Sequence, residues 1–471
     1  MMSKKGRKIQ MNYVEATEYL NTFSNLERTP LDRGARAVIT LDSVRELARR
    51  LGDPQTRFAS IHVAGTKGKG STCAFAASIL CAQGLRVGLY VSPHLDDVRE
   101  RITIDGTKIP ESDFARILSG CVPVLEEMRK PPAGHRRPTY FEIVTHLAFT
   151  YFAEQKVDVA AIEVGLGGRL DATNIVVPDV CGIANISYDH TAILGDTLEL
   201  IAREKAGIFK PGVPVVIAPQ VPEAERALRA SAAKVGAPLE AVGNEILANE
   251  IESASVSEWR MPQAHARLPE GVEYRATLGL RGRHQIENWA LALRLADIFY
   301  RKRFGKALSQ EAVSRGSRDV EWPGRLELVE NNQEKNGPAI FLDGAHNALS
   351  VEVVLNELRA HVRRSPLVCL FGCARDKDVP GMLRAMARTE QGVDSVVFTD
   401  SGNPRSCTPA ELAESWIKIS GRASGVHESS ADGLARAVEL AGANGVVLVL
   451  GSLYLVGKIR AMIRSRQQPL N

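Results

Sequence analysis

The chain has 471 residues, 44% hydrophobic and 24% charged, with a formal net charge of +4 at pH 7. This length exceeds what one hydrophobic core usually serves, so we expect two or three domains, and so weak a charge gives no indication of a nucleic-acid partner, although it suits acidic small substrates. The seven cysteines form no CxxC pair and no run approaches the roughly 18 apolar residues of a spanning helix, which argues against a disulfide framework, a zinc site or a membrane segment. We expect a cytoplasmic monomer.

The first half of the chain alternates strand and helix patterns. Met1 to Lys8 is basic and no apolar segment follows it, so we expect a flexible tail over residues 1–11 rather than a signal peptide. Strands are predicted at Phe58–Ala64, Arg86–Val91, Val157–Val164, Val180–Ser187 and Val213–Ala218. Helices are predicted at Ser71–Gln83, Tyr140–Gln155 and Thr197–Ile208. This alternation indicates a parallel sheet covered on both faces.

The second half changes pattern and then begins a second alternation. Residues 243–282 look β-rich or loop-rich, Gln285–Tyr300 is an apolar helix, and the more polar Arg301–Val320 is the candidate hinge. Strands follow at Ala339–Leu342, Leu367–Gly372, Ser395–Thr399 and Val446–Leu450, with helices near Ser350–Val362, Pro380–Arg388, Pro409–Ile419 and Ala431–Leu440. We therefore predict an α/β protein with a first domain over residues 12–318 and a smaller Rossmann-like α/β domain over 319–471.

A glycine-rich loop joins the first predicted strand to its helix, with the sequence Gly65-Thr66-Lys67-Gly68-Lys69-Gly70-Ser71. Glycines let backbone N–H groups close on a phosphate, and the N-terminus of the helix adds partial positive charge. Lys69 is placed to reach the β/γ-phosphates of a nucleotide, and the Ser71 hydroxyl to face magnesium. The general pattern puts Ser or Thr directly after this lysine, so the intervening Gly70 makes the loop a variant.

Two side chains near other strand ends are candidates for the metal. Glu163 ends an apolar strand, where a carboxylate faces the crevice in which α/β sheets bind ligands. A solvated charge at the strand end is the alternative. His190 follows Asp189 just past the next strand, but magnesium prefers oxygen ligands, so the residue type alone favours a structural histidine.

An ordered set of motifs gives the chain a resemblance to the folylpolyglutamate synthase/dihydrofolate synthase family of the Mur ligase superfamily. The motifs are GTKGKGS (65–71), SPHL (92–95), VRERI (98–102), Tyr140–Thr145, EVGLGGRLDATN (163–174), Ser187–His190 with Leu194-Gly195, EKAGI (204–208), His284-Gln285 with Asn288, WPGR (322–325), DGAHN (343–347) and Gly451–Leu455. Each motif alone is weak, but the ordered set spans nearly the whole chain and is specific.

The resemblance implies a Mur-ligase-type central ATPase domain, built on the phosphate loop and a parallel sheet, followed by the C-terminal glutamate-ligase domain. It implies an ATP-dependent amide ligase that phosphorylates a carboxylate of a folate-type substrate and lets the amino group of L-glutamate attack the acyl phosphate. Phosphorylation supplies a leaving group, so the protein's task is positioning and charge neutralisation. We expect the substrates to be dihydropteroate or a reduced folate, L-glutamate and ATP, and we expect both activities in one chain.

The resemblance also assigns roles to residues. Ser92, Glu163 and His190 match the magnesium ligands, and Asn288 and Arg325 match nucleotide contacts. Asp343 and His346 match the pair that reaches from the second domain toward ATP and glutamate, and Lys205 matches a lysine that the family carries as a carbamate, able to meet a second magnesium. Phe141 is implied in the wall of the pteridine pocket, and Arg99 and Arg101 near the reacting carboxylate.

Several of these residues have simpler interpretations. Without the resemblance, Lys205 is best explained as a surface charge beside Glu204, and Asp343 as part of a turn after a strand. Arginines in exposed loops, such as Arg99 and Arg101, are as often solvated. The basic loop Arg129–Pro138 and residues 243–269 match no motif.

Other classes of function are less consistent with the motifs. A phosphate-loop GTPase should carry an Asn-Lys-x-Asp segment, and Arg375-Asp376-Lys377-Asp378 is not one. A kinase gives no account of the DGAHN motif, and a cell-wall Mur ligase would lack SPHL and VRERI. A non-catalytic nucleotide-binding protein would not need the loop, the carboxylate and the lysine together.

Overall fold

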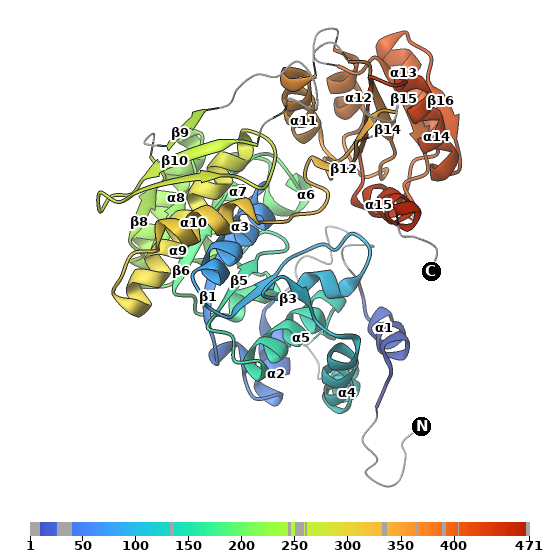
Figure 1. The fold of residues 1–471 in the computed structure, drawn as a ribbon. Coiled ribbons are helices and arrows are strands. Elements are labelled where there is room, and N and C mark those ends of the chain that lie inside the picture. The colour runs from blue at the N-terminus through green and yellow to red at the C-terminus, as the bar shows by residue number, and fades with distance from the viewer. Residues whose placement is uncertain are drawn as a thin grey trace.

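A computed structural model describes residues 10–25, 40–131, 136–243, 246–249, 259, 261–331, 337–362, 365–388, 392–403 and 405–467. Strands alternate with helices over most of these ranges (Figure 1). Residues 1–9 of the predicted tail, and parts of the unassigned segments 129–138 and 243–269, lie outside the described residues. Met11, the last residue of the predicted tail, is held to the fold, because its amide donates to Ser119 Oγ at 3.0 Å.

The larger sheet has eight strands in the order β4-β3-β2-β5-β1-β6-β7-β8. They are β1 (Ala59–Ala64), β2 (Val87–Tyr90), β3 (Ile102–Ile104), β4 (Thr107–Lys108), β5 (Val159–Glu163), β6 (Val180–Ile183), β7 (Val215–Ile217) and β8 (Leu239–Ala241). From β2 to β8 the neighbours are parallel, as predicted, whereas β3 and β4 add antiparallel at one edge. Helices cover both faces, which explains why β5 is an unbroken apolar run up to Glu163.

The helices that cover this sheet include the predicted ones and several others. They are α1 (Tyr13–Asn21), α2 (Asp42–Arg50), α3 (Lys69–Ala82), α4 (Glu111–Met128), α5 (Tyr140–Glu154), α6 (Thr191–Leu194), α7 (Leu198–Lys205), α8 (Pro222–Val235), α9 (His284–Phe304) and α10 (Gln310–Arg318). Helices α3 and α9 pack on one face, and α4 and α5 on the other. The sequence did not predict α4, which contains Pro123. Among the described helices, none has the length and apolar character needed to cross a membrane.

The predicted hinge over residues 301–320 is wrong as a structural element, because most of it is helical. Helix α9 continues to Phe304, and α10 packs on α3, where Ser78 Oγ donates to the Gly316 carbonyl at 2.7 Å. The polar residues had suggested a linker, but Ala312 and Val313 are buried and the polar side chains lie on the opposite face. The connection to the next sheet therefore begins after Arg318, and the exact domain boundary stays a prediction.

Residues 243–282 contain the β structure that their composition suggests. Strands β9 (Ile246–Asn249), β10 (Gln263–Arg267) and β11 (Glu273–Thr277) form an antiparallel sheet in the order β11-β10-β9. The buried residues of β10 and β11 belong to the same hydrophobic cluster as α3 and α9. This small sheet is therefore an addition to the first sheet's helical layer.

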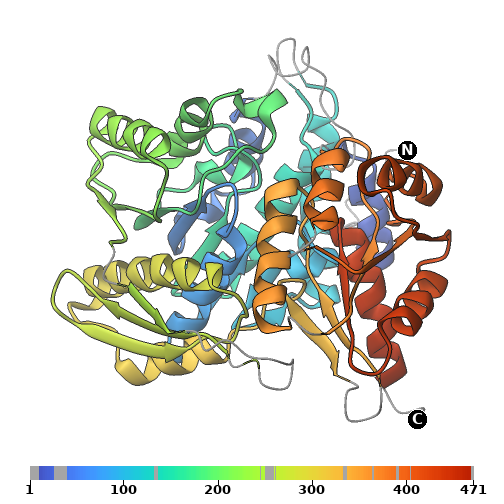
Figure 2. The same cartoon turned by 90° about the horizontal axis from the view of Figure 1, so that it is seen from above.

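The second large sheet has six strands in the order β12-β13-β17-β14-β15-β16. They are β12 (Glu327–Asn331), β13 (Ala339–Leu342), β14 (Leu367–Phe371), β15 (Ser395–Thr399), β16 (Gly425–His427) and β17 (Val446–Leu450), with β12 antiparallel and the others parallel. Its helices are α11 (Ala348–His361), α12 (Val379–Ala387), α13 (Pro409–Ser420), α14 (Ser430–Ala441) and α15 (Leu453–Gln467). The part of the chain that ends with α10 lies beside this second part (Figure 2). All seven cysteines are free thiols.

Candidate active site

The glycine-rich loop turns from β1 into α3, as the sequence predicts. Gly68 has φ 87° and stands directly before α3, in the left-handed region that favours glycine. A Cβ on Gly68 would also lie 2.1 Å from Asn288 Oδ1, so the amide of this α9 residue rests on the loop. The amides of Thr66 and Lys67 donate to the Asn185 carbonyl, at 2.8 and 3.2 Å, and fix the loop against the end of β6. The first turn of α3 leaves its N–H groups available for an anion.

The inserted Gly70 is explained by close packing. A Cβ at this position would lie 2.6 Å from Trp322 Cζ2 and 3.2 Å from Glu163 Oε2. The glycine therefore lets the WPGR segment approach the phosphate loop. Ser71, the next residue, is buried in the first turn of α3.

We predict that Gly70→Ala weakens nucleotide binding about tenfold and lowers the free energy of unfolding by about 1–3 kcal/mol, because the added methyl overpacks the contact with Trp322. ADP titration and thermal unfolding measure the two effects. Gly120→Ala is the matched control, since a Cβ on this α4 residue meets nothing within 4 Å. Equal behaviour of the two variants would contradict the packing explanation.

Lys69, Glu163 and Ser92 lie together at the loop. Lys69 Nζ is 3.9 Å from Glu163 Oε1, and the Ser92 amide donates to Glu163 Oε2 at 3.1 Å. Burial raises the pKa of Glu163, while the positive charge of Lys69 opposes this shift. Glu163 is 6% exposed, so the solvated strand-end alternative is wrong. A buried carboxylate at the mouth of a phosphate loop is a donor suited to a hard divalent cation.

Lys67 and Asp189 form an ion pair across the same loop, with Lys67 Nζ 2.9 Å from Asp189 Oδ2. Burial opposes the charge on Asp189, but Lys67 and His190 outweigh it and lower the pKa of Asp189. Desolvation together with the positive charges of Lys377 and Lys69 lowers the pKa of His190, while Asp189 opposes the shift; the ring stays partly open to solvent. His190 is therefore neutral at pH 7 and offers a lone pair beside the loop.

Lys205 is buried, with 3% exposure, and so the interpretation as a surface charge is wrong. Its Nζ donates to the Gly65 carbonyl at 2.8 Å. Burial lowers the pKa of Lys205 to about 7, and the nearby charge of Lys69 adds to the shift. A large fraction of this amine is neutral at physiological pH and is chemically a nucleophile.

The C-terminal end of α7, which carries Lys205, and the turn that follows it are held against the GLGGR segment by glycine contacts. A Cβ on Gly168 would lie 2.7 Å from the Lys205 carbonyl, and Asn174 Nδ2 donates at 3.0 Å to the Gly207 carbonyl. Asp171 accepts the Leu166 amide at 2.9 Å. Asp171 has no predicted role of its own, although it lies in the EVGLGGRLDATN motif.

The second sheet contributes Asp343, at the end of β13. Its Oδ2 accepts the Leu326 amide and its Oδ1 the Ala345 amide, both at 2.8 Å. Burial raises the pKa of Asp343, and Arg325 opposes this shift. Asp343 therefore links the end of the WPGR motif to the DGAHN motif. This role goes beyond that of a simple turn after a strand.

His346 and Arg325 lie beside this carboxylate. His346 Nδ1 is 2.7 Å from the Gly344 carbonyl, so Nδ1 carries the proton and Nε2 is left as an acceptor. Burial and the positive charges of Lys67 and Lys377 lower the pKa of His346 to about 3. A Cβ on Gly344 would lie 2.5 Å from Arg325 Nη1, which places the guanidinium over DGAHN. Since the positive charge of Lys67 lowers the pKa of His346, the phosphate loop and the DGAHN motif face each other across the two sheets.

The three substrate candidates have different surroundings. Phe141 lies on the GLGG loop, because a Cβ on Gly165 would be 2.6 Å from its Cζ. Arg101 is 1% exposed, its Nε is 2.8 Å from His94 Nδ1, and its charge acts on Glu163. Arg99 instead pairs with Asp97 at 2.6 Å and lies over the Tyr13 ring. The Arg99 guanidinium is thus held by an acidic partner, and its role at the substrate stays a prediction.

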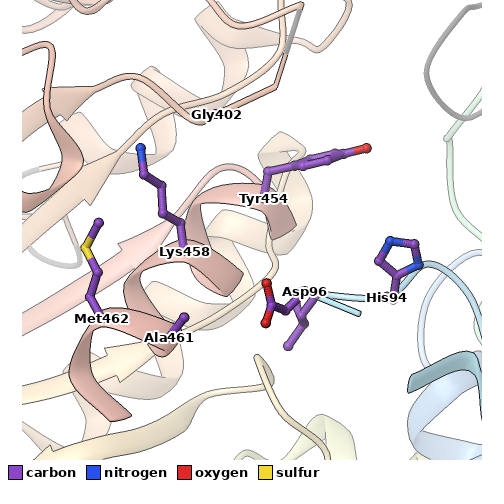
Figure 3. A pocket seen from close by; sticks show the side chains of 8 residues that line it. His94, Asp96, Gly402, Tyr454, Lys458, Ala461 and Met462 are labelled. Carbon is purple, nitrogen blue, oxygen red and sulfur yellow. The ribbon is translucent and has the colours of Figure 1, made fainter. Parts of the chain in front are cut away.

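A cavity of about 420 Å³ lies between the SPHL segment and α15. Figure 3 shows Tyr454, Lys458, Ala461 and Met462 projecting from α15 on one side, with His94 and Asp96 on the other. Leu95 and Gly402 complete the lining. Residues from both large-sheet regions therefore border this space. No sequence motif indicated Lys458.

Two further residues near the loop were missed. Trp322 had been named only as part of WPGR, and its contact with Gly70 could not be predicted from that motif. Lys377 had been considered only in rejecting a GTPase, yet its charge acts on His190 and His346. Both effects depend on the second part of the chain lying over the first.

Residues 63–296 match the Mur ligase middle domain, and residues 324–453 match the Mur ligase glutamate ligase domain. Together with the loop, the carboxylate and the lysines, these matches define an ATP-dependent ligase with the Mur ligase fold.

The chain is 34% identical over 426 residues to dihydrofolate synthase/folylpolyglutamate synthase of Bacillus subtilis, covering 90% of this chain and 95% of that protein. It is similar in structure to Mycobacterium tuberculosis folylpolyglutamate synthase complexed with ADP and AMPPCP, with a TM-score of 0.82, 30% identity, and coverage of 96% of this chain and 98% of that one. It is also similar to E. coli FolC in complex with DHPP and ADP, with a TM-score of 0.79, 30% identity and the same coverages. The chain belongs to the folylpolyglutamate synthase/dihydrofolate synthase family.

Proposed function

We propose that this ligase attaches L-glutamate to a folate-type carboxylate, acting both on dihydropteroate and on reduced folate. One observation carries the proposal: Lys69, the buried Glu163 and the buried Lys205 converge on the glycine-rich turn, where Asn288 and Trp322 also rest. This is a phosphate site with both charge neutralisation and a reactive amine. The resemblance of the chain to enzymes named for both activities supports the substrate class.

The reaction has two steps. A carboxylate oxygen of the substrate attacks the γ-phosphorus of ATP, the bond to the bridging oxygen breaks, and ADP leaves. The amino nitrogen of glutamate then attacks the acyl carbon, an amide bond forms, and inorganic phosphate leaves with the electrons of the broken C–O bond. Lys69 and the N–H groups of α3 neutralise the phosphoryl charge.

His346 is suited to accept a hydrogen bond from the attacking amine in the second step, because its lowered pKa keeps the ring neutral and makes it a weak base. Glutamate enters as an ammonium ion and must lose protons before and during its attack. The neutral His346 ring keeps Nε2 as an acceptor because Nδ1–H donates to Gly344. Asp343 and Arg325 hold the segment that carries this ring, so their role is positioning.

The residues present fit a magnesium ion that keeps several waters. The described residues contain no group of three His, Cys, Asp or Glu side chains able to hold a metal. Magnesium is commonly bound by one or two carboxylates together with phosphate and water oxygens. Glu163, Ser92 and Ser71 supply such oxygens, and the neutral His190 is the additional donor. When bound, the ion would neutralise phosphate charge, and Lys69 would share that task.

Lys205 is proposed to carry a carbamate. A neutral amine adds to CO2 with loss of a proton, and the lowered pKa of Lys205 provides that amine. The product is an anion among Lys69, Lys67 and the loop, where a second magnesium would be attracted. The same group as an ammonium would repel both lysines.

The folate-type substrate is proposed to approach from the SPHL side. Phe141 offers an aromatic wall, and Arg101 a charge near Glu163. The cavity at α15 offers Lys458 to a carboxylate of a glutamyl tail. Small molecules are therefore the proposed partners, and a monomer would suffice because both halves of the site come from one chain.

Product analysis distinguishes the substrates. We expect mass spectrometry to find dihydrofolate from dihydropteroate, and glutamate-extended products from tetrahydrofolate, each with ATP hydrolysis that requires the acceptor and glutamate together. The products with both acceptors are measured in parallel. Turnover of UDP-muramyl peptides in place of folates would overturn the proposal in favour of a cell-wall ligase.

A further inference from the structure

Trp259 lies between β9 and β10, in the region that no motif explains, yet it is part of the core of the second sheet's domain. Its side chain is 7% exposed, and the other buried members of its hydrophobic cluster all come from residues 326–450. The indole stacks on His361 of α11, with ring centroids 4.3 Å apart and ring planes at 14°. It also contacts Phe341 of β13, at 5.5 Å between centroids. In Figure 1, α11 lies on the side of its sheet that faces β9 and β10.

The stacked histidine leads back to the first part of the chain. His361 Nε2 is 3.3 Å from Glu357 Oε1, and Glu357 Oε2 accepts the Arg283 amide at 3.2 Å. Arg283 directly precedes α9, and the guanidinium of Arg281 lies 5.8 Å from the Trp259 ring centroid. Burial opposes the charge on Glu357, but His361 and the Arg283 amide lower its pKa, so this carboxylate is ionised. Trp259, α11 and the start of α9 thus form one connected contact.

The start of α9 matters because Asn288, one turn further along, rests on Gly68 of the phosphate loop. The negative charges of Asp343 and Glu357 also act on His284, the first residue of α9, and oppose the lowering of its pKa by burial. A shift of α11 relative to α9 would therefore change the distance between the Asn288 amide, which touches the phosphate loop, and the Asp343 carboxylate of the DGAHN motif.

We propose that Trp259 is a positioning residue for the nucleotide: by filling the α11 side of the second core, it fixes that domain against the start of α9. The inference rests on the proposed nucleotide contact of Asn288. It assigns Trp259 the role of setting the distance between the two halves of the nucleotide site.

The test compares two buried tryptophans of one cluster. Trp259→Ala is expected to weaken ADP binding about tenfold and to raise the KM for ATP by a similar factor, with kcat changed less than about threefold. Trp259→Phe is expected to restore most of the affinity. Trp416→Ala is the matched control, because Trp416 is buried in the same cluster but packs on Phe398 and Arg422. The control should lower the melting temperature comparably and leave ADP affinity within about twofold.

The outcomes separate positioning from general stability. Wild-type ADP affinity in Trp259→Ala, or an equal loss in Trp416→Ala, would overturn the proposal. If Trp259→Ala does not fold, Glu357→Gln carries the test, because Glu357 links His361 to the Arg283 amide, and unchanged ADP affinity in that variant overturns the proposal. ADP titration needs no folate, so a failed folate assay would leave this result interpretable.

Discussion

Replacing Lys69 by alanine is expected to lower kcat by about 10²–10³-fold, the usual cost of removing one donor that stabilises transition-state charge. The ammonium lies 3.9 Å from Glu163 at the loop, so its loss leaves the γ-phosphoryl group short of one positive charge. It also leaves the buried Glu163 without its nearest counter-charge, which further raises the pKa of that carboxylate. Initial rates of ADP release, with folate and glutamate saturating, measure the effect.

Lys418→Ala is the control for this variant. Lys418 is an exposed residue of α13 that pairs with Glu414 in the preceding turn, so the same change of side chain should leave kcat unaltered. Circular dichroism and thermal unfolding should show that Lys69→Ala keeps the fold. Full activity in folded Lys69→Ala would remove the loop lysine from the mechanism.

Replacing Lys205 by alanine is expected to lower kcat by about 100-fold or more, because the proposed carbamate anion next to the phosphate site would be lost. The side chain is buried, so its removal leaves a space that a short carboxylic acid can enter. Added formate or acetate is therefore expected to restore part of the rate. A neighbouring anion, rather than the lysine skeleton, would then be the functional group.

Two further measurements distinguish the carbamate from a structural lysine. Depleting CO2 should lower the activity of the unsubstituted enzyme, and bicarbonate should restore it. Labelling with 13C-bicarbonate should give a carbamate signal in the NMR spectrum that Lys205→Ala lacks and Lys234→Ala keeps, since Lys234 is exposed at the end of α8. Wild-type activity of Lys205→Ala without added acid refutes the role, and a persistent signal in that variant would assign the carbamate to another lysine.

Strand positions were predictable because a strand buried on both faces appears in the sequence as a short apolar run. Strands β1, β5 and β13 to β15 lie within the predicted apolar runs, since a strand covered on both faces must be apolar throughout. Helix α4 was missed because Pro123 lies inside it, and α10 was mistaken for a hinge because its outward face is polar. In both cases packing against neighbours outweighed the local signal.

The sequence by itself determined the family, the phosphate loop and the strand-end carboxylate, because these depend on short ordered motifs whose residues are close together in the chain. Only the tertiary structure decided that Lys205 is buried and that Arg99 is held by an acidic partner. Burial and charge pairing arise between residues far apart in the chain, as when Trp322 approaches Gly70 or Trp259 enters the second core. The lowered pKa values of Lys205 and His346 follow from that enclosure, and no spacing along the sequence encodes it.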